Sequence, residues 1–194
     1  MNLNVRLINV SIPELALADV ARVSTGRSAF NGGPFYTREE NERLIRSLFQ
    51  REHWSIFEFQ NLIYLVDAPM FVRDQLIRYR AASYNARSLR RCDPLPIIQP
   101  ESEVENYYNE HSLTVYRQLI ESGLKKEDAR GCLPSVAPTQ WIVNYNTREL
   151  FHVFDQRLTK VAQKETRTLV QRMFDEFAAV CPLLANLYLE NHQV

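Results

Sequence analysis

The chain has 194 residues, and its 23 basic and 23 acidic side chains leave no net charge at pH 7. This length suits a single domain over residues 1–194 with a sizeable buried core. Zero net charge argues against a general nucleic-acid binder, whose surface normally carries a basic excess. The sequence holds no apolar run long enough to span a bilayer and no signal-peptide pattern, so we expect a cytoplasmic protein without a membrane partner.

The first half of the chain predicts two strands and two helices. Thr37 and Glu40 have the spacing of a capping box, which starts a helix. Both sets of alternate residues in 59–66 are mainly apolar, which predicts a strand buried on much of both faces. The expected elements are a strand at 5–10, a helix at 16–24, a turn at 32–34, a helix from 37 to about 53, and a strand at 59–66.

The second half predicts mostly helices. Pro69 suits the first turn of a helix, and Arg78 and Arg80 fall at or just past its end. Residues 93–96, Asp-Pro-Leu-Pro, break regular structure. Helices outnumber strands, which predicts the α+β class. The further expected elements are helices at 102–123 and 126–134, a strand at 139–145, and helices at 147–158 and 162–180.

Five arginines and no acid lie between residues 78 and 91. Guanidinium groups bind phosphate oxygens through paired, planar hydrogen bonds, and the serines and asparagine of this segment add short neutral donors. The segment therefore predicts a site for phosphorylated ligands, and the alternative is a solvated loop or helix face. Arg78 and Arg80 would point about 200° apart on a regular helix, which favours contacts to two ligands or two subunits.

Other chemistries lack their sequence patterns. The three cysteines, at positions 92, 132 and 181, lie far apart and are expected to be reduced thiols. The four histidines show no metal-ligand spacing, so no metal is expected. There is no P-loop and no glycine fingerprint of a Rossmann dinucleotide site.

The pattern Arg78-x-Arg80, seven residues and then Ser88 has the spacing of the signature of flavin-dependent thymidylate synthases, and the chain resembles that family. The resemblance implies a helix-rich α+β domain with a small antiparallel sheet, assembled as a homotetramer. It also implies FAD, NADPH and methylenetetrahydrofolate as cofactors. Three other blocks follow the family's order: His53-x-Ser55-x-Phe57-Glu58, Arg130-x-x-Leu133-Pro134, and Asn146-x-Arg148 with Arg157.

The resemblance implies one set of residues that holds the flavin. His152 is expected on the inner side of its helix, where the alternative is a core histidine with satisfied hydrogen bonds. Arg148 and Arg157 are nine residues apart and should face different sides of one helix. The implied flavin ligands are His53, Glu58, Arg78, Tyr79, Arg80, Asn146, Arg148 and His152. For the first two, the alternative is a helix-end histidine beside a capping carboxylate.

A second set is implied to bind the nucleotide. By this match Ser88 and Arg90 hold the phosphate. Arg157 is implied to polarise the pyrimidine ring, since a cation there would stabilise negative charge on the uracil carbonyls during chemistry at C5. The implied nucleotide ligands are Gln75, Ala86, Arg87, Ser88, Arg90, Arg130 and Arg157.

Simpler roles stay open for some of these residues. Gln75 would otherwise be a surface amide, and Arg130 a surface charge paired with Glu127 or Asp128. A catalytic thiolate at Cys92 is a further alternative, because neighbouring arginines lower the pKa of a thiol. The resembled family needs no enzyme nucleophile, which favours the reading without one.

The chain departs from the family's pattern around the nucleotide sugar and the edge of the flavin. Tyr79 replaces the usual histidine between the two signature arginines, and Ala86 replaces the usual acid. Losing that acid beside the ribose is expected to admit a 2′-hydroxyl. Methylases that act on UMP in nucleoside-antibiotic pathways of the polyoxin type resemble this family while differing at such positions. The other departures are Phe59, Leu89 and Arg91.

The sequence thus predicts an enzyme that methylates uracil C5 of dUMP or UMP. By the resemblance, methylenetetrahydrofolate is the carbon donor and reduced FAD the hydride source. The alternative is an RNA-binding or regulatory module that uses the arginine and tyrosine cluster at 78–91. The zero net charge counts against that alternative.

Overall fold

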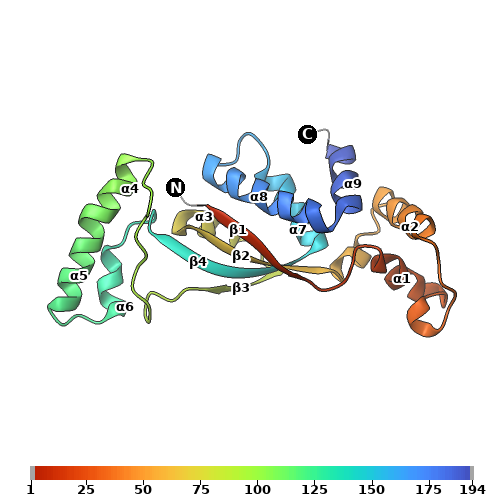
Figure 1. Cartoon of the computed structure of the whole chain (residues 1–194), viewed down its shortest axis with the longest axis horizontal. Coiled ribbons are helices and arrows are strands. Elements are labelled where there is room, and N and C mark those ends of the chain that lie inside the picture. Colours follow the sequence, from red (N-terminus) through yellow and green to blue (C-terminus); the bar gives the residue numbers. More distant parts are fainter. Residues whose placement is uncertain (1–2, 193–194) are drawn as a thin grey trace.

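The computed structural model describes residues 3–192, which form an elongated molecule with a sheet at its centre and helices at both ends (Figure 1). The sheet has four strands in the order β1-β2-β4-β3, and all neighbours are antiparallel. The strands are β1 (Asn4–Val10), β2 (Asn61–Pro69), β3 (Ala82–Ala86) and β4 (Pro138–Asn146). The expected helix-rich α+β fold with a small antiparallel sheet is confirmed.

Helices cover one face of the sheet and extend the molecule at both ends. Figure 1 shows α3, α7 and α8 on one face, α1 and α2 at one end, and α4 to α6 at the other. The helices are α1 (Ala16–Arg22), α2 (Arg38–Gln50), α3 (Met70–Leu76), α4 (Glu103–Tyr107), α5 (Leu113–Glu121), α6 (Lys126–Ala129), α7 (Thr147–Arg157), α8 (Lys164–Val180) and α9 (Pro182–His192). A 3₁₀ helix, Trp54–Glu58, precedes β2.

The sheet is buried on one face only. Leu62, Tyr64 and Val66 of β2 are fully buried beneath the helices, whereas Ile63 and Leu65 on the opposite face are half-buried. The expectation that 59–66 is buried on both faces is therefore wrong, because no helix of the described chain covers the second face (Figure 1). Phe59 also lies outside the strand and is 61 % exposed.

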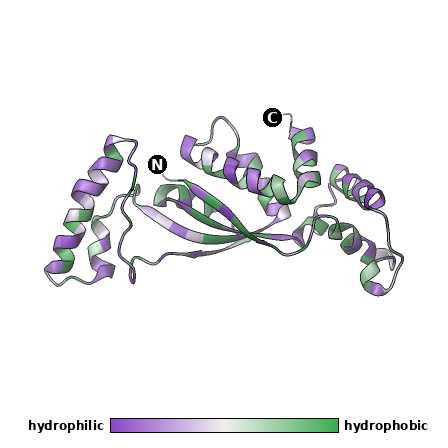
Figure 2. Ribbon diagram, viewed as in Figure 1, coloured by the Kyte–Doolittle hydropathy of each residue, from purple (hydrophilic) through white to green (hydrophobic). Residues whose placement is uncertain are grey.

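Aromatic rings form the core that supports α7. Their ring centroids lie 5.1 to 6.3 Å apart, mostly in edge-to-face or tilted contact. Figure 2 shows hydrophobic residues along the strands and on one side of the flanking helices. A smaller apolar cluster around Tyr108 lies under α4 and α5. The rings belong to Phe49, Phe57, Phe151, Phe154, Phe174, Phe177 and Tyr188.

Most predicted elements are confirmed within a few residues. The capping box is present: Thr37 Oγ1 accepts from the Glu40 amide (3.2 Å), and the Glu40 carboxylate accepts from the Thr37 amide (2.7 Å). The helix expected over 102–123 contains a π-helical turn, Tyr108–Ser112, between α4 and α5.

Two elements were not predicted. The edge strand β3, Ala-Ser-Tyr-Asn-Ala, has only one large side chain, so it lacks the apolar pattern of a strand. Pro182 ends α8 but occupies the first position of α9, where proline needs no N–H partner. The buried Glu14 carboxylate accepts from the amides of Leu183 (3.3 Å) and Leu184 (3.1 Å) and so caps α9 from a distant part of the chain.

Candidate functional site

A cavity of about 540 Å³ lies beside the first turns of α7. Four residues of the implied flavin set line it together: Glu58, Asn146, Arg148 and His152. They come from the 3₁₀ helix before β2 and from the start of α7. These segments are far apart along the chain, since Glu58 and Arg148 are 90 residues apart. The other lining residues are Trp54, Ala81, Glu149, Phe151 and Asp155.

A buried hydrogen-bond network holds these two segments together. The Thr147 amide donates to the Gln60 carbonyl (2.9 Å), and Thr147 Oγ1 donates to Gln60 Oε1 (2.7 Å). Gln60 Nε2 in turn donates to the Ile12 carbonyl (2.8 Å). Both side chains are fully buried, so each of these polar atoms depends on its partner. Thr147 lies between Asn146 and Arg148, and the network therefore fixes both lining residues relative to Glu58.

Each of these lining residues already has a partner within the chain. The Asn146 side chain accepts from the Glu149 amide (2.8 Å) and caps α7. Arg148 forms an ion pair with Glu58 at 2.5 Å, and both side chains are about half exposed (53 % and 45 %). An exposed pair of this kind contributes about 0–1 kcal/mol. A ligand with a suitable acceptor can therefore replace it at little cost.

Tyr79, His152 and Arg157 meet beside this cavity. Tyr79 is 8 % exposed, and its ring lies edge-on to the His152 imidazole at a centroid distance of 5.6 Å. The Arg157 guanidinium carbon lies 5.5 Å from the centre of the Tyr79 ring. Burial raises the pKa of Tyr79, and Arg157 partly offsets the effect. The phenol therefore stays protonated near neutral pH and remains a hydrogen-bond donor.

The structure corrects the expected position of His152. Its side chain is exposed, so it is neither on the inner side of α7 nor a core histidine. The residues facing the core are instead its neighbours Phe151 and Val153. The expectation that Arg148 and Arg157 contact different surroundings is confirmed, since Arg148 pairs with Glu58 while Arg157 lies against Tyr79.

Arg157 is a half-buried cation without a carboxylate partner among residues 3–192. Its Nε is buried without a hydrogen bond, its Nη2 makes a long contact (3.5 Å) to the Gln75 carbonyl, and its guanidinium interacts with the Tyr79 side chain. Gln75 is not a free surface amide: its Nε2 donates to Gln163 Oε1 (2.6 Å) and its Oε1 accepts from Thr166 Oγ1 (3.0 Å). Gln75 thus anchors α3 to α8, and Arg157 keeps donors available for an anionic group.

Arg78 and Arg80 lie in the turn between α3 and β3, not on a helix. Both are exposed on either side of the buried Tyr79, and neither has an ion-pair partner in the described part of the chain. The Tyr84 hydroxyl closes this turn, since it lies 2.7 Å from the Leu76 carbonyl and 3.0 Å from the Tyr79 carbonyl. Burial raises the pKa of Tyr84 to about 12, which keeps this hydroxyl protonated.

A second basic group follows the other end of β3. The Arg87 guanidinium donates to the Asp93 carbonyl (3.2 Å), and Arg90 pairs with Glu127 at 2.9 Å. Arg130 donates to the backbone carbonyl of Glu127 (3.1 Å), so the alternative of a surface charge paired with a carboxylate is wrong. Ala86, the last residue of β3, and Ser88 are exposed beside this group. None of these residues lines the cavity at α7.

His53 lies at the edge of a different cavity, formed by α1 and α2. Its side chain is exposed and makes no capping hydrogen bond to the 3₁₀ helix that follows, of which His53 is the N-cap residue. Trp54, the next residue, lines the cavity at α7. Consecutive residues of the chain thus contribute to the two cavities.

Sequence reasoning missed several lining residues. Trp54, Phe151 and Asp155 carry no motif, and their place depends on how the 3₁₀ helix Trp54–Glu58 packs against α7. Gln60 offered a signal, because an amide between Phe59 and a mainly apolar strand needs buried partners if it points inward. Cys92 is half-buried outside the cavity, and burial raises the pKa of Cys181 to about 12.

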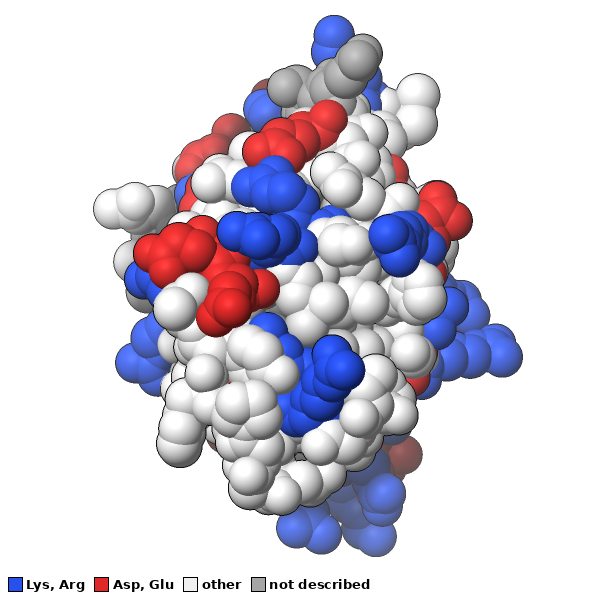
Figure 3. Space-filling view, turned by 90° about the vertical axis from the view of Figure 1, so that its right-hand side faces the viewer, with Lys and Arg blue, Asp and Glu red and all other residues white. Residues whose placement is uncertain are grey.

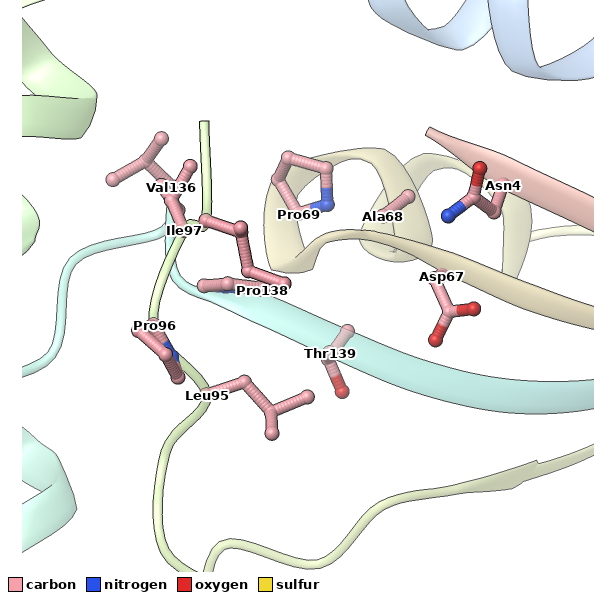
Figure 4. Close-up of a pocket in the computed structure, with 11 residues that line it drawn as sticks. Asn4, Asp67, Ala68, Pro69, Leu95, Pro96, Ile97, Val136, Pro138 and Thr139 are labelled. Carbon is pink, nitrogen blue, oxygen red and sulfur yellow. The ribbon is translucent and has the colours of Figure 1, made fainter. Parts of the chain in front are cut away.

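An apolar cavity of about 220 Å³ lies elsewhere, between residues 95–98 and the ends of β2 and β4 (Figure 4). Its one carboxylate, Asp67, already accepts from Gln140 Nε2 at 2.7 Å. It contains no residue of the two implied sets. Within residues 3–192, no cluster of three or more His, Cys, Asp or Glu side chains could hold a metal ion. No helix in the same range has the length and apolar composition to cross a membrane.

The chain is similar to known proteins over nearly its whole length. The family model described as "Thymidylate synthase complementing protein" matches residues 6–183. The flavin-dependent thymidylate synthase of Saccharolobus solfataricus is 33 % identical over 184 residues, which cover 88 % of this chain and 70 % of that protein. The protein of the same name from Thermosipho africanus is 26 % identical and covers 95 % of this chain and 90 % of its own length.

A solved structure has the same fold. It is described as the UMP/dUMP methylase PolB from Streptomyces cacaoi bound with 5-Br dUMP. The TM-score is 0.84, with 96 % of this chain and 94 % of that chain covered and 23 % of the residues identical. At that identity the likeness shows the fold alone.

Thr147→Val tests whether the buried network sets the cavity. The substitution keeps the side-chain shape but leaves Gln60 Oε1 without its donor, which should lower the free energy of unfolding by about 1–3 kcal/mol. Flavin affinity should fall as well, because Asn146 and Arg148 lose their alignment with Glu58. Urea unfolding and titration with FAD measure the two effects. The control is Thr114→Val on the exposed face of α5, and parent-like stability and affinity in Thr147→Val would contradict the assignment.

Proposed function

We propose that this chain, which belongs to the family of flavin-dependent thymidylate synthases, methylates uracil C5 of a uridine 5′-monophosphate. The observation that carries the proposal is the cavity at α7. It gathers Glu58, Asn146, Arg148 and His152, and the unpaired cation Arg157 lies beside it. The chain is accordingly a thymidylate synthase-like methyltransferase, with a pyrimidine nucleotide as its substrate.

The residues of the cavity fit a flavin. Trp54 and Phe151 offer aromatic walls for a flat ring system, and Asn146 and His152 offer hydrogen-bonding groups. The exposed, unpaired Arg78 and Arg80 fit the phosphates of FAD. Reduced FAD would supply the hydride, methylenetetrahydrofolate the one-carbon unit, and NADPH the electrons that regenerate the flavin. Arg148 would exchange its exposed contact with Glu58 for contact with the cofactor.

Arg157 would act on the pyrimidine. Carbon–carbon bond formation at C5 places negative charge on the ring carbonyls in the transition state. A guanidinium that is already partly desolvated stabilises that charge without the reorganisation that water would need. Tyr79 would hold the guanidinium in place through its ring. This arrangement needs no enzyme nucleophile, which agrees with the absence of any cysteine from the cavity lining.

The cavity at α7 and the implied phosphate ligands Ser88 and Arg90 lie at opposite ends of β3. Ala81 lines the cavity before β3 begins, whereas Ser88 and Arg90 follow the end of β3. Five residues of extended strand span about 17 Å at about 3.3 Å per residue. The eight bonds from phosphorus to uracil C5 reach at most about 12 Å at about 1.5 Å each. We therefore propose that each site takes its phosphate ligands from one copy and its cavity from another.

The open face of the sheet offers a surface for this association. Ile8 and Ile142 are 48 % and 40 % exposed there, and Ile63 and Leu65 are half-buried. These four apolar residues lie among polar ones on this face, and their exposure favours burial against another subunit. We propose a homotetramer of one domain per copy, residues 1–194, located in the cytoplasm, as the family resemblance implies.

The choice between UMP and dUMP depends on how the site treats the nucleotide sugar. Ala86 is exposed at the end of β3 and presents no carboxylate. We propose that the enzyme accepts UMP as well as dUMP, in the manner of secondary nucleoside-antibiotic metabolism. The methylase PolB, which shares the fold, is described as acting on both. No observation favours the RNA-binding alternative, since the arginines of 78–91 separate to the two ends of β3 instead of forming one face.

Arg157→Ala should abolish measurable methylation while FAD stays bound. Loss of a group that stabilises transition-state charge costs about 2.7–4 kcal/mol, or a factor of about 10²–10³ in kcat. Single-turnover formation of the methylated nucleotide measures the rate, and flavin absorbance measures binding. Arg172→Ala on the exposed face of α8 is the matched control. A rate within a few-fold of the parent would show that Arg157 has another role.

Steady-state assays with UMP and dUMP test the sugar proposal. We expect UMP to be used, and Ala86→Glu to shift the ratio of kcat/KM values towards dUMP by up to about a hundredfold, the range within which shape alone rejects a hydroxyl. Ser83→Glu, at an exposed position of the same strand, is the control for added charge. Negligible kcat/KM for UMP in the parent enzyme would refute the proposal.

A further inference from the structure

The cavity between α1 and α2 has no role in the site described so far. It has a volume of about 650 Å³, and His53 at its edge directly precedes Trp54, which lines the cavity at α7. Its floor is apolar, with Leu44 and Leu48 of α2. Figure 3 views this end of the molecule and shows basic side chains set in largely uncharged surface.

Arginines dominate the charge of this cavity. Arg22, Arg27 and Arg43 line it against a single carboxylate, Glu40. Arg22 is buried, its guanidinium lies 3.5 Å from the centre of the Tyr36 ring, and it contacts Asn41 at 2.5 Å. Arg27 and Arg43 are exposed and have no ion-pair partner within residues 3–192. Three arginines against one carboxylate leave an excess of positive charge at the cavity, which favours an anionic ligand.

The form of the cavity favours carboxylates over a phosphate group. Phosphates are commonly bound by free backbone amides at a helix N-terminus or a glycine-rich turn. The N-terminus of α2 is closed by Thr37 and Glu40, and no glycine lines the cavity. The two free arginines instead come from different segments, Arg27 from the loop after α1 and Arg43 from α2. Separate guanidinium groups suit a chain of separate carboxylates.

We propose that this cavity binds the glutamate tail of the folate that donates the one-carbon unit, and that the enzyme prefers a polyglutamylated donor. The inference rests on the proposed function. A folate that reacts in the cavity at α7 would pass His53 and extend its tail into the cavity at α1 and α2. Tyr36, which lines this cavity, offers a ring to its aminobenzoyl group. Each added glutamate brings a further carboxylate towards Arg27 and Arg43.

Binding and kinetics with two tail lengths test the proposal. The FAD-loaded protein is titrated by calorimetry with pteroylmonoglutamate and with pteroyltriglutamate, without nucleotide. We expect the triglutamate to bind about tenfold more tightly, equivalent to one charge-assisted hydrogen bond of about 1.4 kcal/mol. The ratio of KM values for mono- and triglutamylated methylenetetrahydrofolate should show the same preference. In the double variant Arg27→Ala/Arg43→Ala both ratios should fall to about one, and in Arg172→Ala they should stay at the parent value.

The possible results separate this proposal from the proposed function. Equal affinity for both tails in an enzyme that methylates its nucleotide would overturn the tail site and leave the function intact. A double variant that raises the KM for NADPH while keeping the tail preference would assign the cavity to a dinucleotide and also overturn the proposal. An enzyme that binds neither folate and methylates neither nucleotide would overturn both.

Discussion

Two buried side chains, Gln60 and Thr147, determine where the chemistry of this protein can occur. Gln60 ends the segment that carries His53 and Glu58, and Thr147 begins α7 between Asn146 and Arg148. Their hydrogen bonds are fully shielded from water, so either partner alone would leave an unsatisfied polar atom in the core. The pairing of Asn61 with Asn146 at the end of β2 and β4 continues the same alignment. Polar groups from both segments therefore meet on the surface directly above an aromatic core.

The site combines a rigid base with replaceable surface contacts. The rings beneath α7 allow little movement, whereas the Arg148–Glu58 pair is about half exposed and is worth little in water. Arg157 differs from Arg148 because it is partly desolvated and has no carboxylate partner in the described chain. A cation held in this state gains more from a developing negative charge than an exposed one does. The geometry thus favours stabilisation of charge over covalent catalysis by the protein.

Much of the fold was predictable from local patterns, and most of the site was predictable only through the family resemblance. Thr37 and Glu40 predicted α2, and the spacing of apolar residues predicted β2, β4 and α7. The sequence did not predict β3, because most of its residues are small or polar. The strand is held by pairing with β4. The sequence did not predict α9, because the amides at its N-terminus are capped by Glu14, a residue 169 positions away from Leu183. No local pattern indicates that Trp54 and Phe151 share a cavity wall, since that follows from packing of distant segments. The exposure of His152 and the turn at Arg78 and Arg80 depend likewise on where α3 ends.

The central claim is that one site joins the cavity of one copy to the phosphate ligands of another, and mixed assemblies test it most directly. Arg157→Ala and the double variant Ser88→Ala/Arg90→Ala, each inactive alone, are co-expressed with different tags and purified through both. Random pairing of two copies would leave about a quarter of the sites with every ligand intact, so about a quarter of the parent methylation activity should return. Mixed assemblies as inactive as the separate variants would show that Arg157 and the phosphate ligands serve the same site within one chain, which would contradict the claim.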